Sequence, residues 1–164
     1  AEVLTREIPG HWEGDLVLGK NRESAIGTLV ERTTRFLIIV PLKKRDSTTV
    51  RKAFEKEFRK LPDNLKLSLT YDNGTEMAQH KTFTKNSKVK VYFAHPYSPW
   101  ERPTNENTNG LIRDYFPKGT DFNLVSKKQL KEVQNQLNER PRKTLEYESP
   151  LNTISRLYMN QNFI

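Results

Sequence analysis

Polar and apolar residues alternate in the first quarter of the chain. Residues 11–19 (HWEGDLVLG) alternate as a strand with two unlike faces, which puts Asp15 on the face opposite Trp12. Residues 24–32 predict a second strand, and the continuous apolar run 35–42 is typical of a buried third strand. Because the gaps between these stretches are short, we expect antiparallel hairpins.

Over residues 46–62 the spacing of apolar residues changes from that of a strand to that of a helix. Apolar side chains recur there every three or four residues, at Val50, Phe54, Phe58 and Leu61. Asp46 or Ser47 can cap the start of this helix, and Pro62 ends it because proline cannot continue the helical hydrogen bonds. A helix at this point allows a crossover, so the next strand can run parallel to an earlier one.

Period two returns over residues 65–72 (LKLSLTYD), which predicts a strand with one apolar face. Asn73 and Gly74 follow immediately and predict a sharp turn. Residues 75–83 are then compatible with a short helix, and residues 89–94 predict another strand.

Helical patterns fill most of the remaining sequence. They cover residues 104–116 and 126–139, and the second begins with a capping-box pattern, Ser126-x-x-Gln129. Three strands, a helix, a strand, a short helix, a strand and further helices together predict an α/β fold. We expect a mixed sheet with helices packed against it.

Length and composition fit a single globular domain. We assign one domain to residues 1–164, with a leader at 1–9 and a C-terminal helix or tail at 150–164. The absence of cysteine excludes disulfides, thiolate nucleophiles and thiolate metal sites. No apolar run approaches the ~20 residues of a membrane span, and the start lacks the layout of a signal peptide, so we expect a cytoplasmic protein.

The charge balance favours a polyanionic partner. There are 28 Lys and Arg against 20 Asp and Glu, which gives a net charge of +8 spread along the chain. A solvated basic surface is the plain interpretation of this excess. Nucleic acid is the partner that a basic domain of this kind would bind.

Three carboxylates stand out among the acidic residues. Asp15 interrupts an apolar strand, Asp72 ends one before a tight turn, and Glu106 lies 33 residues after Asp72 near a helix start. Each alone has an ordinary structural explanation, as a surface, turn or helix-dipole residue. Together, three oxygen ligands on separate elements could hold two divalent metal ions, Mg²⁺ or Mn²⁺. Two such ions at one site can catalyse reactions of phosphodiesters.

Four segments carry a resemblance to a known family. They are HWEGDLVLG, SLTYDNGTEM, VYFAHPYSPWERPTNENTNGLIRDYFPKGTDF and LNERPRKTLEYESPLN. In this order they resemble the catalytic domain of insertion-sequence-thirty family transposases, and more broadly the retroviral-integrase superfamily with its Asp-Asp-Glu triad. The resemblance covers roughly residues 10 to 152. The order and spacing of several long motifs make it specific.

The resemblance implies a ribonuclease-H-like fold: a five-stranded mixed sheet, three strands antiparallel and two parallel, flanked by helices. It assigns Asp15, Asp72 and Glu106 as catalytic residues and metal ligands, with two ions of Mg²⁺ or Mn²⁺ as cofactor. The implied reaction is hydrolysis of a phosphodiester at a transposon end, followed by attack of the 3′-hydroxyl on target DNA. The implied setting is the bacterial cytoplasm, at the nucleoid, with a homodimer or larger assembly on DNA.

Relatives also carry an amino-terminal region that recognises transposon ends, and nothing in this sequence resembles one. We therefore expect an isolated catalytic core. Candidate contacts to DNA phosphates lie in or near the family motifs: Arg102, Asn107, Lys118, Arg140, Arg142 and Lys143. Asn109 could likewise orient Glu106 or contact phosphate.

Two positions depart from the family pattern, Ala94 where many members have cysteine and Pro103 where many have glycine. A proline is disfavoured inside a helix, so Pro103 predicts that the helix carrying Glu106 starts at or just after it. Pro103 should also stiffen the loop that precedes the helix.

Two alternatives to a transposase core remain open on the sequence alone. One is a ribonuclease-H-like nuclease without strand transfer. The other is a DNA-binding module whose triad is catalytically silent. Convergence of the three carboxylates on a shared cation would favour an enzyme.

Overall fold

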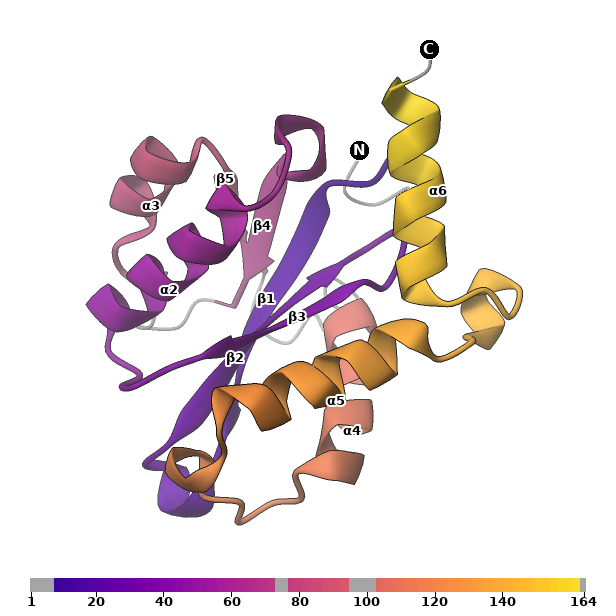
Figure 1. Ribbon diagram of the computed structural model, residues 1–164. Helices are drawn as coiled ribbons and strands as arrows, with labels where there is room; N and C mark the ends of the chain where they lie inside the picture. The colour runs from indigo at the N-terminus through magenta and orange to yellow at the C-terminus, as the bar shows by residue number, and fades with distance from the viewer. Residues whose placement is uncertain (1–7, 73–76, 95–102, 163–164) are drawn as a thin grey trace.

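A single five-stranded sheet forms the centre of the molecule. The computed structural model describes residues 8–72, 77–94 and 103–162, apart from the side chains of residues 103, 105, 106 and 160–162. The sheet order is β3-β2-β1-β4-β5 (Figure 1). The strands are β1 (His11–Leu18), β2 (Ala25–Glu31), β3 (Leu37–Pro41), β4 (Ser68–Tyr71) and β5 (Lys90–Phe93).

The pairing of the strands confirms the expected mixed sheet. β1 pairs antiparallel with β2, and β2 pairs antiparallel with β3. β4 runs parallel to β1, and β5 runs parallel to β4. The three N-terminal strands are therefore joined by short connections, whereas β4 is reached through a helical crossover.

Helices cover both faces of this sheet (Figure 1). The helices are α2 (Ser47–Arg59), α3 (His80–Ser87), α4 (Pro103–Tyr115), α5 (Lys127–Glu139) and α6 (Pro150–Asn162). α2 and α3 lie on one face, and α4 and α5 lie on the other, with α6 packed beside α5. No helix of the described residues combines the length and the apolar character needed to cross a bilayer.

Two hydrophobic cores follow from this layering. Trp12, Phe54 and Phe58 belong to the core under α2 and α3, and Trp12 packs edge-on against Phe58. Val17 and Ile112 belong to the second core, under α4 and α5. Trp12 is fully buried and donates from Nε1 to the Leu65 carbonyl oxygen at 2.7 Å, so it is a packing residue.

The fourth strand starts later than the alternation predicts. It begins at Ser68 rather than at residue 65, because Asp63–Leu65 form a 3-10 turn directly after Pro62. Leu67 consequently lies outside the strand and is 36% exposed. The helix expected at 75–83 is also displaced, since α3 begins at His80. The Asn73-Gly74 turn lies outside the described residues.

Helix starts agree well with the sequence. Asp46 caps α2 by accepting from the Thr49 amide. Ser126 and Gln129 form the expected capping box at the start of α5. α4 begins at Pro103, in the first turn, where a proline costs no hydrogen bond.

Side chains of α5 cover the outer edge of the sheet at β3. Gln134 Oε1 accepts from the Ile39 amide at 3.0 Å. Asn138 accepts from the Leu37 amide and donates to the Leu37 carbonyl oxygen, both at 2.8 Å. The two amide side chains thus satisfy main-chain groups that an edge strand would otherwise leave unpaired.

Candidate active site

The register of two parallel strands brings Asp15 and Asp72 together. His11 of β1 lies opposite Ser68 of β4, and Glu13 lies opposite Thr70. The same register continued by two residues puts Asp15 opposite Asp72, which directly follows the last residue of β4. Both carboxylates are partly exposed. The strands that lead to the two aspartates are thus neighbours in the sheet.

The Asp15 carboxylate contacts helix α4. Its Oδ2 accepts from Asn109 Nδ2 at 3.1 Å, and its Oδ1 accepts from the Leu16 amide at 2.8 Å. Thr28, which lies opposite Asp15 in β2, brings its hydroxyl within 3.5 Å of Asn109 Oδ1. Asn109 therefore joins α4 to the middle of the sheet at Asp15, a partner that the sequence did not suggest for it.

Glu106 belongs to the first turns of α4. It precedes Asn109 by three positions, and positions three apart share a face of an α-helix. The Asn109 contact hence turns the helical face that includes position 106 toward Asp15. The side chain of Glu106 lies outside the described part of the structure, so Asp15, Asp72 and Asn109 define the geometry of the site.

The donor chemistry suits a hard divalent cation. Asp15 and Asp72 offer carboxylate oxygens from adjacent strands, and oxygen ligands are those that Mg²⁺ and Mn²⁺ prefer. Among the side chains that the structure describes, no three His, Cys, Asp or Glu residues are grouped closely enough to hold a metal. Glu106, the predicted third ligand, is outside that set because its side chain is not among those described.

The other predicted DNA contacts are dispersed. Arg102 lies outside the described residues. Asn107 is exposed on α4, and its spacing of two from Asn109 points it to another face of the helix. Lys118 is exposed in the turn after α4. Neither Asn107 nor Lys118 is among the described contacts of Asp15.

Arg140, Arg142 and Lys143 form a basic group after α5. Arg140 donates to the Tyr115 hydroxyl at 3.0 Å, which ties the end of α5 to α4. Burial, followed by the positive charge of Arg140, lowers the pKa of the half-buried Arg142 guanidinium from its ordinary value. Two guanidinium groups thus lie close enough to repel each other, and Lys143 stands exposed beside them.

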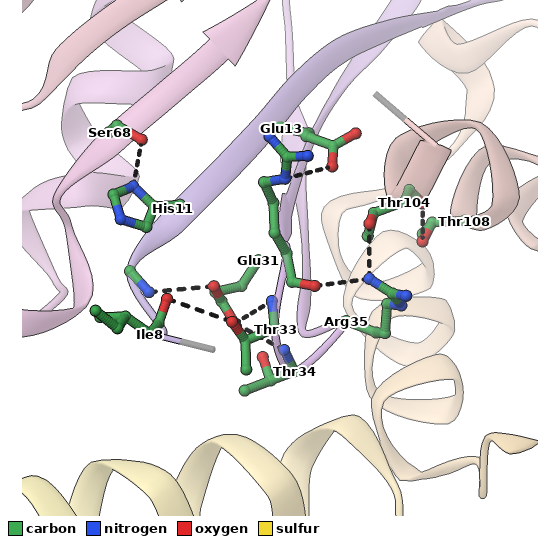
Figure 2. A network of polar contacts seen from close by, with 12 residues as sticks. Ile8, His11, Glu13, Glu31, Thr33, Thr34, Arg35, Ser68, Thr104 and Thr108 are labelled. Atoms are coloured by element: carbon green, nitrogen blue, oxygen red, sulfur yellow. Dashed lines mark hydrogen bonds and ion pairs between the residues drawn. The ribbon is translucent and has the colours of Figure 1, made fainter. Parts of the chain in front are cut away.

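A buried polar network near the start of β1 was not foreseen from the sequence (Figure 2). Glu13 and Arg32 form an ion pair at 3.2 Å, with side chains 0% and 3% exposed. Glu31 accepts main-chain hydrogen bonds from Gly10, Thr33 and Thr34. Burial raises the pKa of the Glu31 carboxyl, and these hydrogen bonds oppose that shift. The sequence signals were Glu13 and Glu31, two charges inside predicted strands.

Comparison with known proteins agrees with the expected family. The family model described as integrase core domain matches residues 6–99. The chain is 52% identical over 154 residues to the transposase InsI for insertion sequence element IS30A of Escherichia coli K12, covering 94% of this chain and 40% of that protein. It is 44% identical over 159 residues to the transposase for insertion sequence element IS1086 of Cupriavidus metallidurans, covering 97% of this chain and 47% of that protein.

The chain therefore spans less than half the length of these curated relatives. Among solved structures, the catalytic core domain of BIV integrase superposes with a TM-score of 0.72 at 16% identity, covering 93% of this chain and 98% of that one. Identity this low shows the fold alone, which is the ribonuclease-H-like fold of retroviral integrase cores. By the match of its own sequence over more than half its length, the chain belongs to the integrase core domain family.

Proposed function

We propose that this chain is the catalytic core of a DNA transposase. It would cut a phosphodiester at a transposon end and join the freed 3′-hydroxyl to target DNA. The site would act in the bacterial cytoplasm, at the nucleoid, within a homodimer or larger assembly. The observation that carries the proposal is the β1–β4 register, which sets Asp15 beside Asp72 where the Asn109 face of α4 meets the sheet.

Asp15, Asp72 and Glu106 are the residues that would hold divalent cations. The integrase core family generally uses divalent metal ions, and we propose Mg²⁺ or Mn²⁺, two ions, for this chain. Bound at these carboxylates, the ions would supply Lewis-acid stabilisation of the phosphodiester oxygens and lower the pKa of the attacking hydroxyl. The family model ends before Glu106, so this third ligand rests on its place in α4.

The chain's own residues would position the substrate. Asn109 fixes the orientation of the Asp15 carboxylate, which limits the motion of one metal ligand. Arg140, Arg142 and Lys143 would bind the DNA backbone, because a phosphate between two repelling guanidiniums relieves that repulsion. Asn107 and Lys118 are weaker candidates for the same role, since no described contact groups them with the acidic site, and Arg102 stays a candidate outside the described residues.

Plasmid nicking tests the proposal. The whole chain is incubated with supercoiled plasmid and Mg²⁺ or Mn²⁺, and open circles are counted for wild type, Asp72→Asn and Glu106→Gln. Each substitution should lower the nicking rate by at least about 100-fold, because a carboxylate ligand is lost at the reacting phosphate. Glu132→Gln, an exposed glutamate on α5, is the matched control and should nick as wild type does.

Strand transfer is followed in the same reaction with a labelled duplex carrying a free 3′-hydroxyl. Labelled plasmid products that depend on Asp72 and Glu106 would support the transposase. Nicking without joining would favour the nuclease alternative. Salt-sensitive plasmid binding with no cutting in either metal would favour a silent DNA-binding module. Equal nicking by wild type and Asp72→Asn would overturn the triad.

A further inference from the structure

We propose that Arg35 is a positioning residue, which holds the first turn of α4 so that Glu106 meets the two aspartates. The inference rests on the proposed metal role of Glu106. It assigns a function to the β2–β3 turn, a segment that supplies none of the proposed metal ligands. In Figure 2, the β2–β3 turn lies in space between strand β1 and the first turn of helix α4.

The turn is built around the buried Glu31 carboxylate. Its Oε1 accepts from the Thr33 amide at 3.0 Å and from the Thr34 amide at 2.8 Å, and its Oε2 accepts from the Gly10 amide at 3.1 Å. The Arg35 amide donates to the Glu31 carbonyl oxygen at 2.9 Å, which closes the turn. This number of main-chain contacts fixes the backbone from which the Arg35 side chain leaves.

The Arg35 guanidinium then bridges the turn and α4. Its Nη1 donates to the Arg32 carbonyl oxygen at 2.6 Å and to the Thr104 hydroxyl at 2.7 Å. Thr104 is buried, and its own carbonyl oxygen accepts from the Thr108 hydroxyl at 3.0 Å. Arg35 is thus attached to a buried residue two positions before Glu106.

Neither the turn nor the helix by itself explains an arginine at this position. Arg35 adopts a left-handed conformation with φ of 64°, where glycine or asparagine would be less strained. A positive charge at the start of a helix is opposed by the helix dipole, so the contact does not serve as a helix cap. What the arginine provides is a link between two elements.

The link reaches the strand that carries Asp15. The Arg32 carbonyl oxygen accepts the hydrogen bond from Arg35, and the Arg32 side chain forms the buried ion pair with Glu13 of β1. Glu13 precedes Asp15 by two positions and so lies on the same face of β1. A chain of contacts therefore runs from β1 through Arg32 and Arg35 to the turn of α4 that includes Glu106.

Binding of Mn²⁺ by the whole chain, measured by electron paramagnetic resonance, separates this role from plain folding. Thr104→Val removes the hydroxyl that receives Arg35 and keeps the side-chain shape, whereas Thr104→Ser keeps the hydroxyl. Arg35→Lys keeps the charge but lacks the planar fork. We expect Thr104→Val and Arg35→Lys to weaken Mn²⁺ binding by about 10- to 100-fold, the usual effect of losing a residue that orients a ligand. Thr104→Ser should bind as wild type does.

Plasmid nicking supplies the second readout. A loosened ligand should cost more activity in Mg²⁺ than in Mn²⁺, because Mg²⁺ demands nearly ideal octahedral geometry. If Glu106→Gln weakens Mn²⁺ binding while Thr104→Val and Arg35→Lys bind normally, the positioning role is wrong and the triad stands. If Glu106→Gln binds Mn²⁺ as wild type does, the proposed function fails instead. Circular dichroism confirms folding, and either variant alone decides the outcome if the other unfolds.

Discussion

Two acidic residues on one face of β1 have opposite environments. Glu13 is completely buried and faces the guanidinium of Arg32 at 3.2 Å. Asp15, two positions later, is partly exposed, and its described hydrogen bonds come from the neutral amides of Leu16 and Asn109. The fold itself neutralises the first carboxylate. The second carboxylate is partly exposed, accepts hydrogen bonds from these two amides, and is a proposed metal ligand.

The contrast separates a structural carboxylate from a candidate ligand. A buried charge has to be paired within the protein, because desolvation without a partner is costly. A metal ligand needs an orienting contact that does not cancel its charge. Substitutions at Glu13, Glu31 and Asp15 test this contrast, and their expected effects on stability decrease in that order.

Glu13→Gln should have the largest effect. It leaves the Arg32 guanidinium buried without its counter-charge, and breaking a buried pair in this way costs about 3–5 kcal/mol. Urea unfolding followed by circular dichroism measures the loss. The double variant Glu13→Leu, Arg32→Met should recover most of the stability, because both charges are gone. A single variant as stable as wild type would contradict the structural role.

Glu31→Gln should have an intermediate effect. The amide keeps one acceptor oxygen for Thr33 and Thr34, but its NH₂ group then faces the Gly10 amide, another donor. An unsatisfied buried donor costs about 1–3 kcal/mol in unfolding free energy. Glu132→Gln is the exposed control and should change the unfolding midpoint little.

The pH dependence gives an independent check on Glu31. Because burial raises its pKa, the folded state binds the proton more readily than the unfolded state, whose ordinary value is 4.5. Stability from this group is therefore full below that value and declines as pH rises through the raised pKa. The stability difference between wild type and Glu31→Gln should shrink over this rise, and a growing difference would mean that the hydrogen bonds outweigh burial.

Asp15→Asn should change stability least. The amide oxygen can keep the Leu16 bond, and rotation of the Asn109 amide can restore the other contact. We expect a change within about 0.5 kcal/mol, as at a partly exposed position that keeps its hydrogen bonds, together with loss of plasmid nicking. Destabilisation comparable to that of Glu13→Gln would make Asp15 a structural residue and erase the contrast.

Local patterns predicted much of the fold, since strand alternation and helix capping are recorded in neighbouring residues. The predicted start of β4 was wrong. Leu65 and Leu67 continue the alternation of apolar and polar residues, but the turn after Pro62 leaves them outside the strand. The positions of Asp15, Asp72 and Glu106 were proposed from the family resemblance, and the sheet register and the start of α4 are compatible with it.

Long-range polar contacts could not be predicted. The Arg35–Thr104 hydrogen bond joins residues 69 positions apart, and the Asn138–Leu37 contact joins residues 101 apart. No periodicity links such pairs, because each depends on how separate elements pack. Asn109 shows the same difficulty: its place beside Glu106 was visible, but its bond to Asp15 was not.

The side-chain amides of Gln134 and Asn138 on α5 also limit how copies of this chain can associate. Along β3, every second residue directs its main-chain amide away from the sheet. The amides of Leu37 and Ile39 already donate to Asn138 and Gln134, and Pro41 has no amide hydrogen. An incoming strand would find no main-chain donor there, so the sheet cannot grow across this edge while α5 stays in place. The closed β3 edge thus protects the basic chain from strand-mediated aggregation on this side of the sheet, whereas β5, at the opposite edge, is not covered by these side chains.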